Sequence, residues 1–173
     1  AAAILVGNVV ALRQERLKLL VAYSTVAQIG YLFLMFPLAF DATAGALAPG
    51  GAQAGGMLQA ISHALAKAAM FMAAGLIYKA LSHDRIGEMA GIGRALPLTV
   101  LTFALAGLAL MGLPPSGAFA AKKLLLDAAA DSGQWWWGLV LDVGGLLTAS
   151  YVVLVLSHAL APTATPVRLC APV

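Results

Sequence analysis

Three polar side chains, Gln59, His63 and Lys67, are spaced four residues apart within the long apolar stretch 57–79. In a helix this spacing places them on one face, one turn apart. If the helix crosses a membrane, Lys67 lies about 18 Å from its inner end, too far for easy snorkelling. Ionisable groups at such depth are costly and mark function, and a histidine beside a lysine could pass a proton. The alternative is a polar stripe that only packs helices together, which a parallel stripe of alanines also fits.

A second group of residues interrupts the apolar stretch 96–130, which is too long for a single membrane span. Proline removes a backbone donor and glycine loosens the chain, so we expect a helix break here. The break residues are Gly112, Pro114, Pro115 and Gly117. Broken membrane helices line cavities and ion sites, and Lys122 follows this break by about one and a half turns. The alternative is that the helix ends at Leu113 and that Lys122 lies in an interfacial helix.

Lys18 begins the second apolar stretch and is the last candidate for a proton path; it also fits a snorkelling lysine at the membrane surface. Asp142 lies about two turns into the fifth stretch, where we expect it only to satisfy polar groups at a packing contact. The sequence shows no metal-ligand spacing, phosphate loop or nucleophile pattern. We therefore expect no catalytic residue, no metal site and no cofactor in this chain.

The composition requires a lipid environment for the elements that carry these residues. Of 173 residues, 62% are hydrophobic and 10% are charged, against about 45–50% and 25% in soluble domains. A soluble fold of this size could not bury so much apolar surface. The net charge of +3 is too small and too scattered for nucleic-acid binding, and the single cysteine, Cys170, allows no internal disulfide.

Five apolar stretches define the expected elements: 1–12, 17–40, 57–79, 96–130 and 135–161. In a bilayer only helices satisfy the backbone within each segment, and about 20 residues cross it. We predict an all-α, polytopic transmembrane helix bundle with four full spans, a truncated first span and a discontinuous fourth span. Because the first stretch is short and begins without Met, we expect the chain to be a fragment. Residues 42–56, with their loop glycines, and the tail 162–173 are expected to be irregular.

Alternate loops are basic, which sets the expected orientation. The basic residues are Arg13, Arg16 and Lys18 in one loop, and Lys79, Arg85 and Arg94 in another. The remaining loops hold Asp41 in one case and Asp127 with Asp131 in the other, and three tryptophans follow the latter. We expect the basic loops to face the cytoplasm, in a multi-pass protein of the bacterial inner (plasma) membrane.

Three ordered motifs resemble a known family. Residues 14–31 resemble its Q-x-x-(I/L)-K-x-x-x-A-Y-S-(S/T)-x-x-Q-x-G-(Y/F) stretch, and residues 62–71 contain its H-A-x-x-K-A-x-x-F. Residues 112–122 resemble its G-L-P-P-x-x-G-F-x-x-K. The family comprises the antiporter-like proton-translocating subunits of respiratory complex I, membrane-bound hydrogenases and multisubunit cation/proton antiporters. The residues of the H-A-x-x-K-A and G-L-P-P motifs favour the antiporter or hydrogenase branch of the family over complex I.

The resemblance implies roles for individual residues. His63 corresponds to the central-axis histidine, Lys67 to its polar neighbour, and Lys122 to the lysine on the discontinuous helix at the exit half-channel. Lys18 matches the lysine at the head of its helix, but Arg16 replaces an acidic residue common before it, which weakens a role for Lys18. The family has two inverted five-helix repeats, and residues 1–161 resemble the second, with its first helix clipped. Ala118 stands where the family usually has glycine, which bears on the shape of the break.

The function implied is proton translocation, coupled to redox chemistry or cation exchange in a larger complex of NADH:quinone oxidoreductase or hydrogenase type. The partners implied are other membrane subunits, the lipid bilayer and protons, with Na+ or K+ if a cation is exchanged, and no nucleic acid. Two alternatives stay open. One is a structural or assembly subunit without its own ion path, and the other is uptake of another solute such as inorganic carbon.

Overall fold

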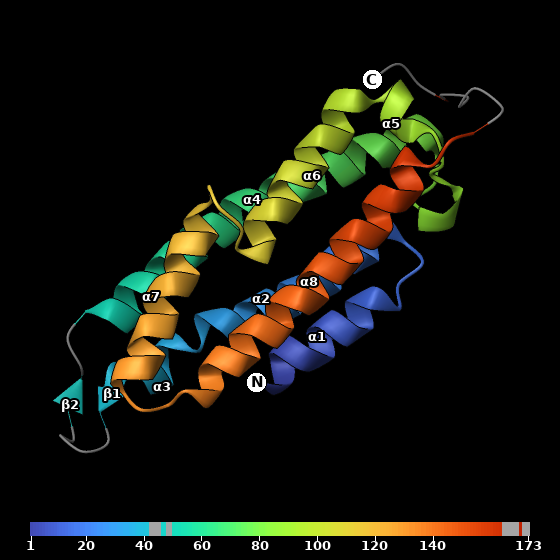
Figure 1. The fold of residues 1–173 in the computed structure, drawn as a ribbon. Coiled ribbons are helices and arrows are strands. Elements are labelled where there is room, and N and C mark those ends of the chain that lie inside the picture. Colours follow the sequence, from blue (N-terminus) through green and yellow to red (C-terminus); the bar gives the residue numbers. More distant parts are fainter. Residues whose placement is uncertain (42–45, 48–49, 164–169, 171–173) are drawn as a thin grey trace.

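The computed structural model describes residues 1–41, 46–47, 50–163 and 170, and it forms an elongated helical bundle (Figure 1). Its helices are α1 (Ala2–Leu12), α2 (Leu17–Leu32), α3 (Met35–Ala39), α4 (Gly51–Leu81), the 3-10 helix η1 (Ile86–Glu88), α5 (Ile92–Ala95), α6 (Pro97–Met111), α7 (Gly117–Asp131) and α8 (Trp136–Leu160). Two-residue strands β1 (Phe40–Asp41) and β2 (Ala46–Leu47) pair antiparallel. The predicted all-α class is confirmed.

Three segments are long and apolar enough to cross a membrane, namely Leu17–Ala39, Gly51–Leu81 and Trp136–Leu160, while Ala2–Leu12 and Pro97–Met111 are shorter apolar helices. The fourth span is discontinuous, as predicted. In Figure 1, α6 and α7 follow one another along the length of α4, and α4 contacts both. Gly112 ends α6 with a φ of 72°, a conformation that favours glycine. Ser116 caps the N-terminus of α7, and its hydroxyl accepts a hydrogen bond from the Phe119 N–H at 3.1 Å.

The start of α4 corrects the prediction that residues 42–56 are irregular, because the helix begins at Gly51. Two of its glycines, Gly55 and Gly56, are packing residues and not loop residues. A Cβ atom added to Gly55 would lie 3.1 Å from the Leu124 Cβ, and one added to Gly56 would lie 2.5 Å from the Met35 Sδ. Small residues allow such close helix contacts. Residues 42–45 and 48–49 of that stretch lie outside the described residues, as do 164–169 and 171–173 of the predicted irregular tail.

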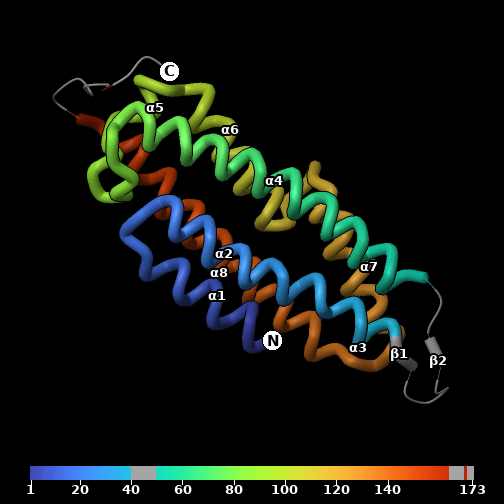
Figure 2. The backbone as a smooth tube through the Cα atoms, turned by 180° about the vertical axis from the view of Figure 1, so that it is seen from behind, coloured from blue at the N-terminus to red at the C-terminus, as the bar shows by residue number. Residues whose placement is uncertain are grey.

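Both basic loops lie at the same end of the bundle, and Figure 2 shows the turn between α1 and α2 beside the loop that follows α4. Backbone hydrogen bonds join them: the Leu17 N–H donates to the Asp84 carbonyl at 2.7 Å, and the Ile86 N–H to the Glu15 carbonyl at 2.8 Å. We call this the basic end, and the end with the α7–α8 turn the opposite end.

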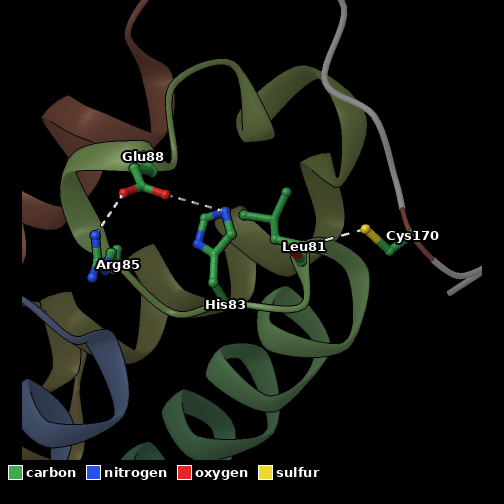
Figure 3. Close-up of polar contacts among 5 residues, drawn as sticks. All are labelled: Leu81, His83, Arg85, Glu88 and Cys170. Carbon is green, nitrogen blue, oxygen red and sulfur yellow. Dashed lines mark hydrogen bonds and ion pairs between the residues drawn. The ribbon is translucent and has the colours of Figure 1, made fainter.

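Side chains and the described tail residue also close this loop (Figure 3). The Glu88 carboxylate lies 3.2 Å from the Arg85 guanidinium and 3.8 Å from His83 Nε2. The thiol of Cys170 contacts the Leu81 carbonyl at 3.9 Å. The loop that connects α4 to α6 is therefore tied to the α1–α2 turn, and the last turn of α4 contacts the tail residue Cys170.

Candidate functional site

Buried polar side chains form a layer at mid-length of the bundle, between two apolar clusters. The cluster toward the basic end includes Leu17, Met70 and Val155, and the cluster toward the opposite end includes Ile4, Leu34 and Leu141. Each long helix that joins the clusters carries buried polar groups between them. The polar layer comprises Asn8, Ser24, Gln28, Gln59, His63, Lys67 and Thr148. The predicted stripe on α4 thus faces the interior of the bundle and not its surface.

Lys67 is the charged member of the polar layer and is only 5% exposed. Its ammonium donates to the Val21 carbonyl at 3.0 Å and to the Ser24 hydroxyl, both on α2. It lies about 21 Å along α4 from Leu81, and no carboxylate pairs with it among the described residues. An ammonium held by neutral oxygens in a low-dielectric interior is costly.

His63 lies one turn before Lys67 on the same face of α4 and is buried. Its Nδ1 has no hydrogen-bond partner within the described part of the chain. Buried polar atoms almost always have a partner, whether protein or water. The ring is therefore available to a water molecule or a further polar group, which a proton-exchanging residue requires.

Gln59 links α4 to the helix break. Its side-chain N–H donates to the Gln28 Oε1 at 3.2 Å, and Gln28 in turn donates to the Leu110 carbonyl in the last turn of α6 at 3.5 Å. Both glutamines line a small cavity together with Gly112 and Lys122. The cavity has room for about one water molecule. The structure thus brings Gln59 and Lys122 to one internal space.

Lys122 forms an ion pair that the sequence analysis missed. Its Nζ lies 2.9 Å from the Asp142 Oδ1 on α8. The aliphatic stem passes Gly112, where an added Cβ would lie 3.5 Å from the Lys122 Cδ, and the ammonium passes Gly145 at a similar distance. Asp142 and Lys122 lie at similar depths in two consecutive apolar stretches, and this could have suggested that they form a pair. The sequence does not show whether the two helices turn these side chains toward each other.

The remaining break residues shape the turn between α6 and α7. Pro114 and Pro115 lie exposed in this turn. Gly117, the first residue of α7, lies so close to α4 that a Cβ atom there would collide with the Ser62 hydroxyl. Ala118 is buried and lines the cavity, so the methyl group that replaces the family's glycine is accommodated.

Lys18 lies apart from the polar layer. It is in the first turn of α2, at the basic end, and its ammonium lies 3.5 Å from the centre of the Tyr78 ring. A lysine over an aromatic ring forms a cation–π contact, and tyrosine is enriched at membrane surfaces. This geometry fits the alternative in which Lys18 is a snorkelling lysine at the membrane surface.

Comparison with known proteins places this arrangement among membrane subunits of respiratory and antiporter complexes. A family model described as "NADH:quinone oxidoreductase/Mrp antiporter, TM" matches residues 1–148. The chain is 37% identical over 161 residues to NADH-quinone oxidoreductase subunit N of Desulforudis audaxviator, covering 92% of this chain and 30% of that protein. It is 29% identical over 154 residues to F(420)H(2) dehydrogenase subunit N of Methanosarcina mazei, covering 84% and 29%.

A solved structure of the Mrp complex from Dietzia sp. contains a chain that superposes with a TM-score of 0.84 and 29% identity, covering 95% of this chain and 29% of that one. The relatives come from more than one branch, so they do not favour the antiporter or hydrogenase branch over complex I. This chain spans about 30% of the length of the relatives it matches. The resemblance of the three motifs is confirmed: this multi-pass membrane chain belongs to the NADH:quinone oxidoreductase/Mrp antiporter transmembrane family.

Proposed function

We propose that this chain is part of a membrane subunit that translocates protons in a larger complex, with residues 1–161 as its second five-helix repeat. The observation that carries the proposal is the Lys67 ammonium at mid-length of α4, buried and without a carboxylate partner among the described residues. A protein that needed only helix packing would gain more from an apolar side chain there. A titratable amine at this depth is typical of ion pathways.

The proposed path follows the polar layer. Protons move between Lys67 and His63, which are one turn apart, and then past Gln59 and Gln28 to the cavity that Lys122 lines. Water in the cavity completes the connection to Lys122. A charge that arrives at one lysine changes the proton affinity of the next through Coulomb interaction, which is strong at low dielectric. Lys18 enters the proposal only as an anchor at the membrane surface.

We propose that other membrane subunits of the complex and the lipid bilayer surround the chain, in the inner membrane of a bacterium with the basic end toward the cytoplasm. The positive-inside rule supports this orientation. Large apolar side chains such as Leu98, Leu105 and Leu146 are exposed on the outside of the bundle, as lipid or subunit contact requires. We propose protons as the transported ion because the side chains of His63 and Lys67 bind protons. Any exchange for Na+ or K+ takes place elsewhere in the complex.

The test is proton flux in proteoliposomes that contain the full-length parent protein in its complex. We expect Lys67→Ala and Lys122→Ala each to lower coupled flux by tenfold or more, at unchanged abundance of the complex. Two exposed lysines on the same helices, changed by Lys79→Ala and Lys123→Ala, are matched controls and should retain flux. Retained flux in both Lys67→Ala and Lys122→Ala would contradict the proposal. Reduced abundance with normal flux per complex would favour the structural alternative, and solute uptake without proton flux would favour the transport alternative.

A further inference from the structure

Lys122 lies between two different spaces. Toward the interior it lines the cavity that also contains Gln28 and Gln59. Toward the surface Lys122 and Asp142 line a groove. The apolar walls of this groove include Leu113 and Leu146. Asp142 borders the groove but not the cavity. The ion pair between Lys122 and Asp142 is therefore the link between the internal polar layer and the outer surface of the chain.

The two partners of this pair differ in exposure. The Lys122 side chain is 25% exposed, whereas that of Asp142 is 66% exposed. Asp142 lies about 9 Å along α8 from Trp136, and therefore within the membrane-crossing segment. A carboxylate facing hydrocarbon at this depth is costly, whereas one facing water or a neighbouring subunit is not. The groove must accordingly be wet or covered by polar protein.

We propose that Asp142 receives the proton from Lys122 and passes it to water in the groove, as the last protein group before release toward the opposite end. This inference rests on the proposed function. In the first step an N–H bond of the Lys122 ammonium breaks and an O–H bond forms on the Asp142 carboxylate, which leaves a neutral amine and a neutral carboxyl group. In the second step the Asp142 O–H bond breaks, a groove water takes the proton, and the carboxylate is restored.

The geometry supports this order of events. A separation of 2.9 Å is a hydrogen-bond distance for a charge-assisted pair, so the proton needs no movement of either helix. Gly145 lies beside the Lys122 ammonium, where an added Cβ would be 3.5 Å from Nζ, and both residues line the groove.

The experiment compares variants of the full-length parent complex in proteoliposomes. We expect Asp142→Asn to lower proton flux at least tenfold at normal complex abundance, and Asp142→Glu to restore at least half of it. Asp127→Asn, at an exposed carboxylate on α7, is the matched control and should change flux less than twofold. Lys67→Ala, measured in parallel, reports on the proposed function itself.

A second measurement uses the unmodified complex. A membrane-soluble carbodiimide attaches to protonated carboxyl groups, so during turnover we expect a mass-spectrometric label on Asp142 together with loss of flux. A fixed counter-charge stays ionised and is not labelled.

The outcomes separate the two proposals. Normal flux in Asp142→Asn, with loss of flux in Lys67→Ala, overturns the role of Asp142 and leaves the proposed function standing. Normal flux in both variants contradicts the proposed function. If Asp142→Asn fails to assemble, the carbodiimide decides: a label on Asp142 with inhibition supports the transfer, and an unlabelled Asp142 overturns it.

Discussion

At the scale of single residues, the Lys67 ammonium is stabilised by dipoles and not by a formal negative charge. The Ser24 hydroxyl donates to the Val21 carbonyl at 2.9 Å, which leaves its lone pairs directed toward Lys67. Both oxygens belong to one turn of α2. A carboxylate in this place would hold the lysine permanently charged, whereas neutral oxygens leave its charge adjustable. The pairing thus suits a group that gains and loses a proton.

We predict that Ser24→Ala weakens this exchange without abolishing it. A hydrogen bond to a charged group contributes about 1.5–3 kcal/mol, so the charged form of Lys67 becomes harder to populate and proton flux should fall roughly tenfold. Flux is measured in proteoliposomes at equal complex abundance. Ser150→Ala is the control, because the exposed Ser150 hydroxyl bonds to the Leu146 carbonyl of its own helix, α8. Equal flux in the Ser24→Ala and unmodified complexes would show that Ser24 does not support Lys67.

Part of the candidate site was predictable from spacing alone. Gln59, His63 and Lys67 share a face because a helix repeats every 3.6 residues, and this holds whatever the helix packs against. Ser24 and Asp142 were not predicted as partners. Their contacts with Lys67 and Lys122 depend on how neighbouring helices are rotated and shifted against one another, which local sequence does not encode.

At the scale of elements, α4 positions both halves of the site because it packs along α6, α7 and α2. Sequence patterns predicted the bounds of the spans closely, since apolar length defines a membrane helix. They failed at the start of α4. Glycine-rich stretches usually indicate loops, but Gly55 and Gly56 lie where α7 and Met35 approach the helix backbone. In membranes small residues stabilise such close helix contacts. The packing between helices therefore outweighs the weak helix propensity of glycine.

We predict that Gly117→Ala disturbs the junction between α7 and α4. The new Cβ atom would collide with the Ser62 hydroxyl, and overpacking of this kind costs about 1–3 kcal/mol. The purified full-length protein should therefore unfold at a lower temperature and, because α7 carries Lys122, show reduced flux.

The second change Ser62→Ala removes the colliding oxygen and should restore most of both properties. Gly75→Ala, on α4 with no neighbouring atom within 4 Å of the added Cβ, is the control and should not destabilise the protein. If Gly117→Ala is as stable as Gly75→Ala, α7 is free to move away from α4 and the close contact is not required.

At the scale of the whole molecule, two apolar clusters enclose a polar layer, and both ends of the bundle carry charged or aromatic residues. This order along the bundle axis is typical of a chain that crosses a bilayer and carries an internal path at mid-depth. The apolar stretches predicted which segments form the helices of the bundle. The alignment of the polar layer across four helices required the tertiary structure, because it depends on the relative heights of the helices.

The orientation leads to a last prediction, which concerns the single crossing made jointly by α6 and α7. With Cys170 and any other cysteine of the parent replaced, Gly87→Cys lies in the loop at the basic end and Ser132→Cys in the turn at the opposite end, both exposed. A membrane-impermeant maleimide should label Ser132→Cys in intact cells and Gly87→Cys only in inside-out vesicles, each with at least a tenfold preference.

Labelling of both sites from the cytoplasmic side would mean that the chain does not cross the membrane between positions 87 and 132. A transfer from Lys122 to Asp142 toward the opposite side of the membrane could then not operate. Labelling from opposite sides requires the chain to cross between positions 87 and 132. Because α6 has only 15 residues, about 22 Å of helix, that crossing needs α7 to complete a hydrocarbon core of about 30 Å. Lys122 would then be held within the membrane, as the proposed proton transfer to Asp142 requires.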